Sequence, residues 1–296
     1  MPDSQWVEVA PEVFVRAYDH LQLNITVVRG CDDLLLVDSR SSPTEGIELK
    51  TDLAEFLPAQ VRMLVNTHAH FDHTFGNQSF GSDPIEGVPI YGHHRLPAHL
   101  DSYERPRLAA WRADGGGEPD RDWDDLRITP PNRLVASSQT VRVGGRTVLL
   151  HPLGPGHTDT DLVLHVPDAR AWIVGDVVEA SGPPMFGSGC FPLELPNQLG
   201  SLLADLDETD IVVPGHGPVV DRAFVASQLA EVERFAQQLR LAHRSGDSVE
   251  RVLADHDRWP FPAEGLELAV RRAFAHLDTA ESDPPVIPAH TPPRRT

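Results

Sequence analysis

Cysteine is scarce in this 296-residue chain, which contains only Cys31 and Cys190. Two cysteines cannot build a disulfide framework or a thiolate zinc site. Long apolar runs are also missing, because no stretch approaches the roughly 18 consecutive apolar residues that a membrane-spanning helix needs. The first residues lack the basic and apolar segments of a secretory signal, so the sequence predicts a cytoplasmic protein.

Positive charge is the second scarcity. Lys and Arg together number 25 against 44 Asp and Glu, the formal net charge is −19, and Lys50 is the single lysine. Phosphate backbones and anionic lipid surfaces are bound by clustered Lys and Arg, so this balance argues against both, and against a metal-dependent nuclease. We therefore expect a small-molecule substrate, no nucleic acid and no membrane partner, and we leave a homodimer open.

Histidine, by contrast, is abundant, with 15 residues. Hydrophobic residues make up 40% and charged residues 23%, which is typical of a folded globular protein. The length lies at the upper edge of what one compact domain reaches. If the chain binds a metal ion, it does so through imidazole and carboxylate groups.

Strand patterns dominate the first two thirds of the chain, and helical patterns the last third. A helix is predicted from Ser42 to about Phe56, and apolar residues recur at helical spacing from Arg222 to Leu277. Residues 102–132 are polar and contain many helix- and strand-breaking residues, which indicates an exposed insertion. Residues 281–296 contain five prolines and few apolar side chains, so we expect a disordered tail. Strands are predicted at 23–28, 34–37, 61–65, 88–91, 134–136, 141–143, 147–150, 162–166, 171–174 and 211–213.

The densest group of chemically capable residues directly follows the predicted strand 61–65. It is the run His68-Ala69-His70-Phe71-Asp72-His73. Residues two apart on an extended segment point the same way, so His68 and His70 can reach one ion. Asp72 and His73, at the following turn, can reach a second ion nearby. Imidazole and carboxylate without thiolate suit Zn²⁺ first, with Mn²⁺ or Fe²⁺ as alternatives.

Three further strand ends each carry a glycine and one metal-capable side chain. They are Gly156-His157, Gly175-Asp176 and Gly215-His216. Glycine lets the backbone turn sharply, so that the neighbouring side chain can face a cleft at the edge of a sheet. Together with the first run they supply five histidines and two aspartates, which are enough for two metal ions.

The order of these residues resembles the metallo-β-lactamase superfamily of binuclear hydrolases, whose signature is His-x-His-x-Asp-His followed by a later His, a bridging Asp and a final His. The resemblance covers roughly residues 6–220. It implies an α+β fold, the four-layer αββα sandwich with metals at one sheet edge. We therefore expect a catalytic domain at 1–220, a C-terminal helical extension at 221–280 and the tail at 281–296.

The resemblance also implies a role for each residue. Two Zn²⁺ ions are expected per chain, with Fe or Mn as alternatives. Asp38 matches the family's early aspartate that braces the ligand loop, although a plain strand-terminating turn would look the same. The implied ligands are His68, His70 and His157 for the first zinc, Asp72, His73 and His216 for the second, and Asp176 bridging both.

The implied chemistry is hydrolysis by a hydroxide that bridges the two metals, with Asp72 orienting this nucleophile. Asp176 favours thioesterases and lactonases, because true zinc β-lactamases generally lack a bridging aspartate at that strand end. We therefore predict cleavage of a thioester, lactone or related ester. The alternatives are a mononuclear iron enzyme similar to persulfide dioxygenases, and a β-lactam hydrolase.

Several other segments can shape the cleft. The insertion at 102–132 can roof it, and the loop Gly182 to Phe186 after Asp176 can wall it. We interpret the arginines between Arg222 and Leu277 as solvated helix faces. His20 can approach the site from an early hairpin. We interpret the other histidines near the site as surface or supporting residues, namely His93, His94 and His99.

Overall fold

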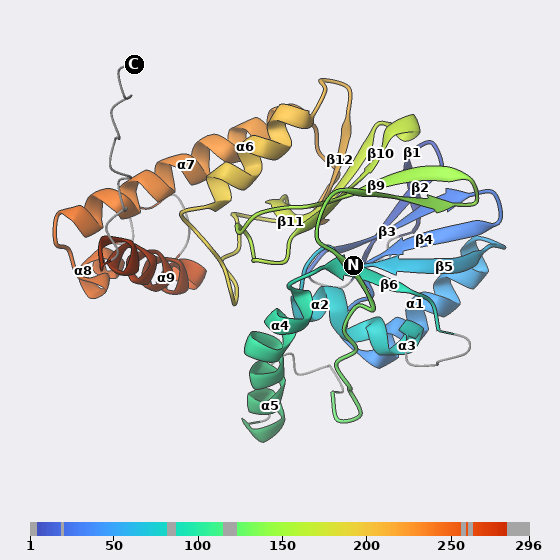
Figure 1. The fold of residues 1–296 in the computed structure, drawn as a ribbon, viewed down its shortest axis with the longest axis horizontal. Coiled ribbons are helices and arrows are strands. Elements are labelled where there is room, and N and C mark those ends of the chain that lie inside the picture. Colours follow the sequence, from blue (N-terminus) through green and yellow to red (C-terminus); the bar gives the residue numbers. More distant parts are fainter. Residues whose placement is uncertain are drawn as a thin grey trace, which may run out of the picture.

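The computed structural model describes residues 5–18, 21–81, 87–114, 123–255, 259 and 263–282. The described residues form twelve strands. Figure 1 shows the strands between helices of the first half and helices of the C-terminal half. The strands of the first half are β1 (Val7–Ala10), β2 (Val13–Tyr18), β3 (Leu23–Gly30), β4 (Asp33–Val37), β5 (Gln60–Val65), β6 (Ile90–His93) and β7 (Arg133–Val135). Those of the second half are β8 (Gln139–Val143), β9 (Arg146–Pro152), β10 (Leu162–Val166), β11 (Ala171–Glu179) and β12 (Ile211–His216).

The two sheets of the sandwich are joined at one point. The strand order is β7-β6-β5-β4-β3-β12-β11-β10-β9-β8, with β2 also pairing with β3 and β1 with β2. Between β3 and β12 the register consists of the pair Leu23 and His216. The ladder is therefore continuous through this pair, and the junction lies beside a predicted metal ligand.

Alternation along the strands places two apolar faces on each sheet. In β4, Leu35 belongs to the cluster that fills the space between the sheets, whereas Leu34 and Leu36 belong to the outer cluster under α1. In β11, Ile173 faces the central cluster and Trp172 the outer one. Successive side chains of a strand point to opposite faces, so an apolar run buried on both sides is what a sheet between two layers requires.

Helices cover both outer faces of the sandwich. Helix α1 (Pro43–Phe56) begins at the N-cap Ser42, whose side chain accepts from the Glu45 amide, and it packs Leu49 and Leu53 on the first sheet. The second sheet is covered by α6 (Leu195–Asp205), α7 (Arg222–Arg244), α8 (Val249–Ala254) and α9 (Ala263–Ser282). The expected α+β class and the αββα sandwich are confirmed.

The sequence indicated that residues 102–132 are an exposed insertion, but the described parts of this segment, 102–114 and 123–132, also contain buried side chains. A π-helical turn (Leu100–Glu104) leads into α5 (Arg105–Asp114), and Trp123 and Leu126 are buried beside Phe75. The polar composition concealed a small apolar cluster whose partners lie far apart in the chain. Shorter segments around it are α2 (Phe71–Thr74), a 3-10 turn (Phe75–Asn77), α3 (Gln78–Gly81) and α4 (Leu96–His99).

The C-terminal helices share one apolar cluster with the second sheet. Val225 and Phe235 of α7 and Phe274 of α9 pack in the same cluster as Trp172 and Val174 of β11. The division at residue 220 therefore stays a prediction. Beyond Ser282 the expected tail lies outside the described residues. Within the described part, no helix is both long and apolar enough to cross a membrane.

Candidate metal centre

All seven predicted ligands lie at one edge of the sandwich, on loops, in a short helix and in two strands. His68 and His70 follow β5, while Asp72 and His73 lie in the short helix α2. The other three are His157 between β9 and β10, Asp176 in β11 and His216 at the end of β12. The six ligands other than Asp176 are each at most 7% exposed, and the Asp176 side chain is also 7% exposed.

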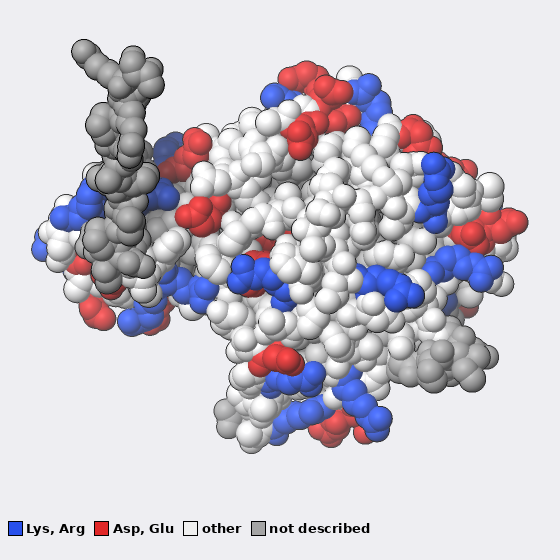
Figure 2. All heavy atoms as spheres, viewed as in Figure 1, with Lys and Arg blue, Asp and Glu red and all other residues white. Residues whose placement is uncertain are grey.

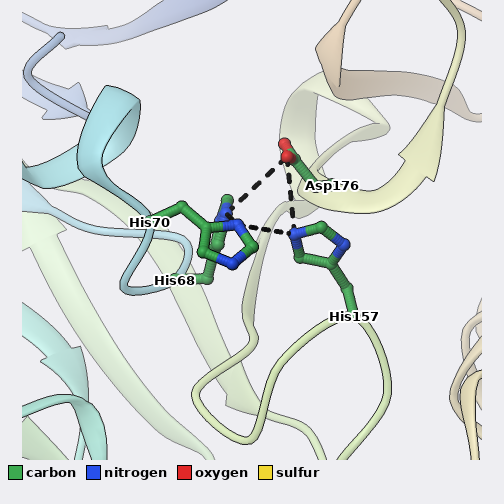
Figure 3. A group of neighbouring side chains, drawn as sticks. All are labelled: His68, His70, His157 and Asp176. Carbon is green, nitrogen blue, oxygen red and sulfur yellow. Dashed lines mark hydrogen bonds and ion pairs between the residues drawn. The ribbon is translucent and has the colours of Figure 1, made fainter. Parts of the chain in front are cut away.

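The first group converges on one point through three imidazole rings. The His70 Nδ1 atom lies 3.0 Å from His68 Nε2 and 3.0 Å from His157 Nε2. Figure 3 shows the three rings turned toward one another with the Asp176 carboxylate above them. Its Oδ2 atom lies 3.6 Å from His68 Nε2 and 3.5 Å from His157 Nε2.

The second group lies on the other side of the same carboxylate. His73 Nε2 and His216 Nε2 are 3.3 Å apart, and Asp72 Oδ2 lies 3.2 Å from His216 Nε2. Asp176 Oδ1 lies 3.2 Å from His73 Nε2, and Asp176 Oδ2 lies 3.4 Å from His216 Nε2. The carboxylate of Asp176 therefore stands between the two groups, within reach of both.

This arrangement fits two metal ions. A tetrahedral Zn²⁺ with bonds of about 2.0–2.1 Å separates its nitrogen ligands by roughly 3.4 Å, close to the distances within each group. Three ring nitrogens facing one point cannot all be satisfied by shared protons. The Asp176 Oδ1 atom is buried without a hydrogen-bond partner among the described residues, which is costly unless a cation neutralises it.

The outward-facing nitrogen of several rings has a fixed partner. His73 Nδ1 lies 2.8 Å from Asp38 Oδ2, His216 Nδ1 lies 2.9 Å from the Leu21 carbonyl, and His70 Nε2 lies 3.0 Å from the Ser188 carbonyl. Such partners fix the tautomer and direct the other nitrogen toward a metal. The predicted bracing role of Asp38 is matched by this geometry.

Asp38 also holds the ligand loop itself. Its Oδ1 accepts from the Thr67 amide at 2.8 Å, and its Oδ2 accepts from the Thr67 hydroxyl at 2.8 Å. The backbone of Asp38 is left-handed, with φ of 64°, which is unusual for a residue other than glycine. Strain of this kind persists where the surrounding contacts over-determine the conformation.

The two groups differ in their electrostatics. Burial, reinforced by neighbouring imidazoles, holds the pKa of His68 and of His70 well below the usual value, so both rings are neutral and ready to ligate. Burial alone would also lower the pKa of His73. The carboxylates of Asp176 and Asp72 outweigh burial and raise this pKa well above the usual value.

The carboxylates respond in the opposite direction. Burial would raise the pKa of Asp72 and Asp176, but His73 and His216 beside them hold both below the usual range. Both aspartates are therefore ionised, as a metal-ligating carboxylate must be. His216 follows His73, because Asp176 beside it outweighs burial and raises its pKa well above the usual value.

A cavity of about 420 Å³ opens onto the two groups. Asp72, Asp176 and His216 line it, and Leu21 and Met185 add apolar surface. Met185 and Gly187 lie in and just after the loop 182–186, so the prediction that this loop walls the cleft is confirmed. The 102–132 segment contributes Arg107 to the lining.

A third group of potential ligands is made of His70, His99 and Glu104. His70 offers this group only Nε2, which already contacts the Ser188 carbonyl. His99 Nδ1 lies 2.6 Å from Asp159 Oδ1. We therefore regard this group as a support for the metal centre, which agrees with the interpretation of His99 as a supporting residue.

The sequence also led to expectations about other histidines and about the C-terminal arginines near the site. His93 is buried at the end of β6, His94 is exposed, and His20 lies outside the described residues. The sequence suggested that the C-terminal arginines are solvated, but two of them bind backbone carbonyls. Arg240 donates to the Leu193 carbonyl at 2.9 Å, and Arg272 donates to the Cys190 carbonyl. Both hold the loop that follows the site, and neither lines its cavity.

Sequence reasoning missed four contributors to the site. Three of them, Arg107, Ser188 and the Leu21 carbonyl, come from segments without a motif. Gln198 was also missed, although its Oε1 accepts from the His157 amide at 3.2 Å. Its position in an ordinary amphipathic helix gave no signal of this contact.

Comparison with known families agrees with this geometry. Residues 18–216 match the metallo-beta-lactamase superfamily, and this match covers more than half of the chain. The chain therefore belongs to the metallo-beta-lactamase superfamily.

Individual relatives are distant. A human protein, acyl-coenzyme A thioesterase MBLAC2, is 24% identical over 169 residues, which are 52% of this chain and 58% of that protein. A metallo-beta-lactamase from Pontibacter korlensis aligns with a TM-score of 0.60 and 18% identity over 78% of this chain and 99% of its own. The sec-alkylsulfatase Pisa1 from Pseudomonas sp. aligns with a TM-score of 0.73 and 16% identity over 95% of this chain and 52% of its own.

The similarity to these proteins covers only part of some of them. The chain spans somewhat more than half of the length of the thioesterase and about half of the alkylsulfatase. The lactamase alignment covers 78% of this chain, whereas the alkylsulfatase alignment covers 95% of it. At these identities, the solved structures show a shared fold.

Proposed function

We propose that this protein is a zinc-dependent hydrolase with two metal ions, acting on a thioester, with lactones and related esters as the neighbouring substrate classes. The observation that carries the proposal is the Asp176 carboxylate between two complete ligand groups, 3.2 Å from His73 Nε2 and 3.5 Å from His157 Nε2. One carboxylate within reach of two imidazole groups suits a bridging ligand.

The two ions would be held by the seven side chains already described. Bound there, Zn²⁺ would lower the pKa of water toward about 7 and polarise the acyl carbonyl. The protein's own residues fix the geometry of that chemistry. Asp38 and the Leu21 carbonyl orient the His73 and His216 rings. Both rings are buried, so bulk water has little access to them.

Asp72 has a second task in this proposal. It lines the cavity as well as contacting His216, so its carboxylate can orient the attacking water and accept its proton. The water oxygen forms a bond to the acyl carbon while the carbon–sulfur bond breaks. The thiolate leaves and takes up a proton, so that a carboxylic acid and a thiol are the products.

A thioester is favoured over the other esters by the similarity to a protein whose name describes an acyl-coenzyme A thioesterase. The presence of Asp176 favours thioesters and lactones together over β-lactams. A β-lactam substrate is the weaker alternative, because the superfamily's true zinc lactamases generally lack this aspartate. A mononuclear iron enzyme would leave the complete second group, Asp72, His73 and His216, without a role.

We expect the binding partner to be a small-molecule substrate in the cytoplasm. On the face drawn in Figure 2, Lys and Arg side chains are separated by acidic and uncharged surface rather than gathered into a continuous track. This distribution agrees with the net charge of −19 in giving no support to nucleic-acid binding.

The decisive experiment combines metal content with a substrate panel. The purified protein is analysed for zinc, iron and manganese, and its hydrolysis rates are measured on a thioester, a lactone, a β-lactam, a phosphodiester and a secondary alkyl sulfate. About two zinc ions per chain with preferred thioester or lactone turnover supports the proposal. One iron ion with oxygen consumption on a persulfide contradicts it.

Asp72→Ala is the matching variant. We expect it to abolish turnover while the thermal unfolding profile of the sandwich persists, because Asp72 lies in the short helix α2 rather than in the sheet. Asp124→Ala, at an exposed position of the 102–132 segment, serves as the control. Retained activity in Asp72→Ala would show that the assigned role is wrong.

A further inference from the structure

Arg107 is the single Lys or Arg among the described residues that line the metal-centre cavity. It comes from the first turn of α5, in a segment that carries no family motif. Its side chain is 24% exposed, so the guanidinium is partly withdrawn from water yet open to the cavity. The chain has 44 acidic residues that could pair with its arginines. An arginine that faces the cavity instead therefore indicates a role in binding.

The guanidinium is held in place from one side. Its Nη2 atom donates to the Ser188 hydroxyl and lies 3.5 Å from Glu104 Oε1. The Ser188 hydroxyl in turn donates to Glu104 Oε1 at 2.8 Å, and Glu104 is fully buried. The guanidinium carbon lies 5.7 Å from the ring centre of Phe71 and 5.4 Å from that of Trp111. The head group is therefore positioned before any ligand arrives.

The remaining donors of Arg107 are free. Nη2 makes both polar contacts, so Nε and Nη1 have no hydrogen-bond or ion-pair partner among the described residues. A guanidinium presents its donors in a planar fork that matches the two oxygens of a carboxylate or phosphate. A fixed fork with free donors, at the edge of a cavity, is suited to binding an oxyanion.

Ser188 places this fork relative to the metal centre. Its hydroxyl contacts Arg107, while its carbonyl lies 3.0 Å from His70 Nε2 of the first ligand group. The lining next to the second group is mixed. Leu21, whose carbonyl contacts His216, and Met185, 59% exposed, contribute apolar surface. Gln22, Glu179 and Ser181 contribute polar groups to the same lining. Arg107, the single Lys or Arg of the described lining, therefore lies next to the first group.

We propose that Arg107 determines substrate specificity by binding an oxyanionic group of the substrate. The inference rests on the proposed hydrolase function and narrows its substrates to esters or thioesters that carry a carboxylate or a phosphate. Arg107 is a binding residue in this proposal, and Glu104 and Ser188 are positioning residues that hold its fork.

The test compares matched thioesters on the zinc-loaded enzyme. The neutral reference is the S-butanoyl thioester of 2-mercaptoethanol. Three anionic arms carry a carboxylate on the thiol (3-mercaptopropionate), a carboxylate on the acyl group (a glutaryl methyl thioester) and a phosphate on the thiol (phosphopantetheine). The arm that is preferred identifies which anion, and which side of the scissile bond, faces Arg107.

The variants are Arg107→Gln, Arg107→Lys and the control Arg105→Gln. Arg105 lies on the same helix but is 53% exposed, paired with Asp101 at 2.7 Å, and does not line the cavity. We expect the wild type to prefer one anionic arm over the neutral thioester by on the order of tenfold to a hundredfold in kcat/KM. Arg107→Gln should bring this ratio close to unity through KM, Arg107→Lys should keep part of it, and Arg105→Gln should keep all of it.

Equilibrium binding separates this inference from the proposed function. Calorimetric titration with the non-hydrolysable thioethers of the neutral and preferred anionic compounds should show the same preference, and the same loss in Arg107→Gln. Absence of turnover on every thioester, with this binding preference intact, would contradict the proposed thioester hydrolysis but not the role of Arg107. A ratio near unity in the wild type, or a preference unchanged in folded Arg107→Gln, would overturn the role of Arg107.

Discussion

The Nδ1 atom of His73 lies 2.8 Å from Oδ2 of Asp38, and the two residues come from segments on either side of β5. The same Asp38 carboxylate also accepts from the amide and hydroxyl of Thr67, the residue before His68. One side chain therefore orients a ligand of the second group and the backbone that leads to the first.

Replacing Asp38 by Asn should weaken metal binding. The amide keeps the size of the side chain but loses the charged acceptor for His73, and loss of such supporting partners typically lowers metal affinity by about 10–100-fold. Zinc affinity is measured by competition with a chromophoric chelator. Asp33→Asn, at the other end of β4 in an exposed pair with Arg62, should leave the affinity unchanged. Equal affinities in the wild type and in Asp38→Asn would contradict the bracing role.

Metal binding by the two ligand groups can be tested separately by replacing one histidine of each group. His157→Ala removes a ligand from the first group alone, and His216→Ala removes one from the second. We expect each variant to retain about one tightly bound zinc where the wild type retains two, as measured by elemental analysis after dialysis. His276→Ala, an exposed histidine of α9, should retain both ions. Loss of both ions in each variant would mean that the groups bind metal only as a unit.

Much of this site could be predicted because its ligands are local in sequence. His68, His70, Asp72 and His73 lie within six residues, and the other ligands each sit beside a glycine at a strand end. Alternating or fully apolar runs predicted the individual strands in the same direct way, and the family resemblance carried by the ligand motif implied the sandwich. Such features depend on neighbours along the chain, which a sequence displays.

The surroundings of the site could not be predicted because they depend on tertiary contacts. Arg107 contacts Ser188, which is 81 positions away, and Trp123 donates to the Ser41 carbonyl across 82 positions. Both residues lie in a segment whose polar composition suggested exposure. The burial of Trp123 follows from the shape of the fold, and no local pattern reports it.

Substitution of Gly215 should displace the Asp176 carboxylate, the proposed bridging ligand. A Cβ atom at this position would lie 1.8 Å from Asp176 Oδ1, so Gly215→Ala must displace Asp176 or the β12 backbone. We expect turnover to fall by on the order of a hundredfold, since displacements of about 1 Å at a reacting centre have effects of this size. Gly154→Ala, in the loop before His157, meets nothing within 4 Å and should behave as the wild type. Comparable activities of the two variants would show that Asp176 does not need its present position.

The two cysteines should differ in reactivity. Burial raises the pKa of the Cys190 thiol to about 12, against the smaller opposing effect of Arg272, whereas Cys31 is exposed. A thiol with a raised pKa carries almost no thiolate at pH 8, and thiolate is the reactive form. A chromogenic disulfide reagent should therefore titrate one thiol per native chain at pH 8 and two after unfolding. In Cys31→Ser the native chain should show none; rapid labelling of this variant would mean that Cys190 is accessible.

His93 should make the protein sensitive to mild acid. Burial, reinforced by His94 and Arg95, lowers the pKa of His93 from 6.5 to about 4. The folded state thus binds this proton less readily than the unfolded chain does, so the stabilising contribution is present above pH 6.5 and is lost as the pH falls toward 4. Between pH 7.5 and 5, with screening by solvent included, this single group removes on the order of 1 kcal/mol from the free energy of unfolding. Denaturant titrations at both pH values should show that His93→Gln loses less stability than the wild type by on the order of 1 kcal/mol, while His276→Gln loses the same amount as the wild type. Identical losses in all three proteins would show that His93 does not set the acid response.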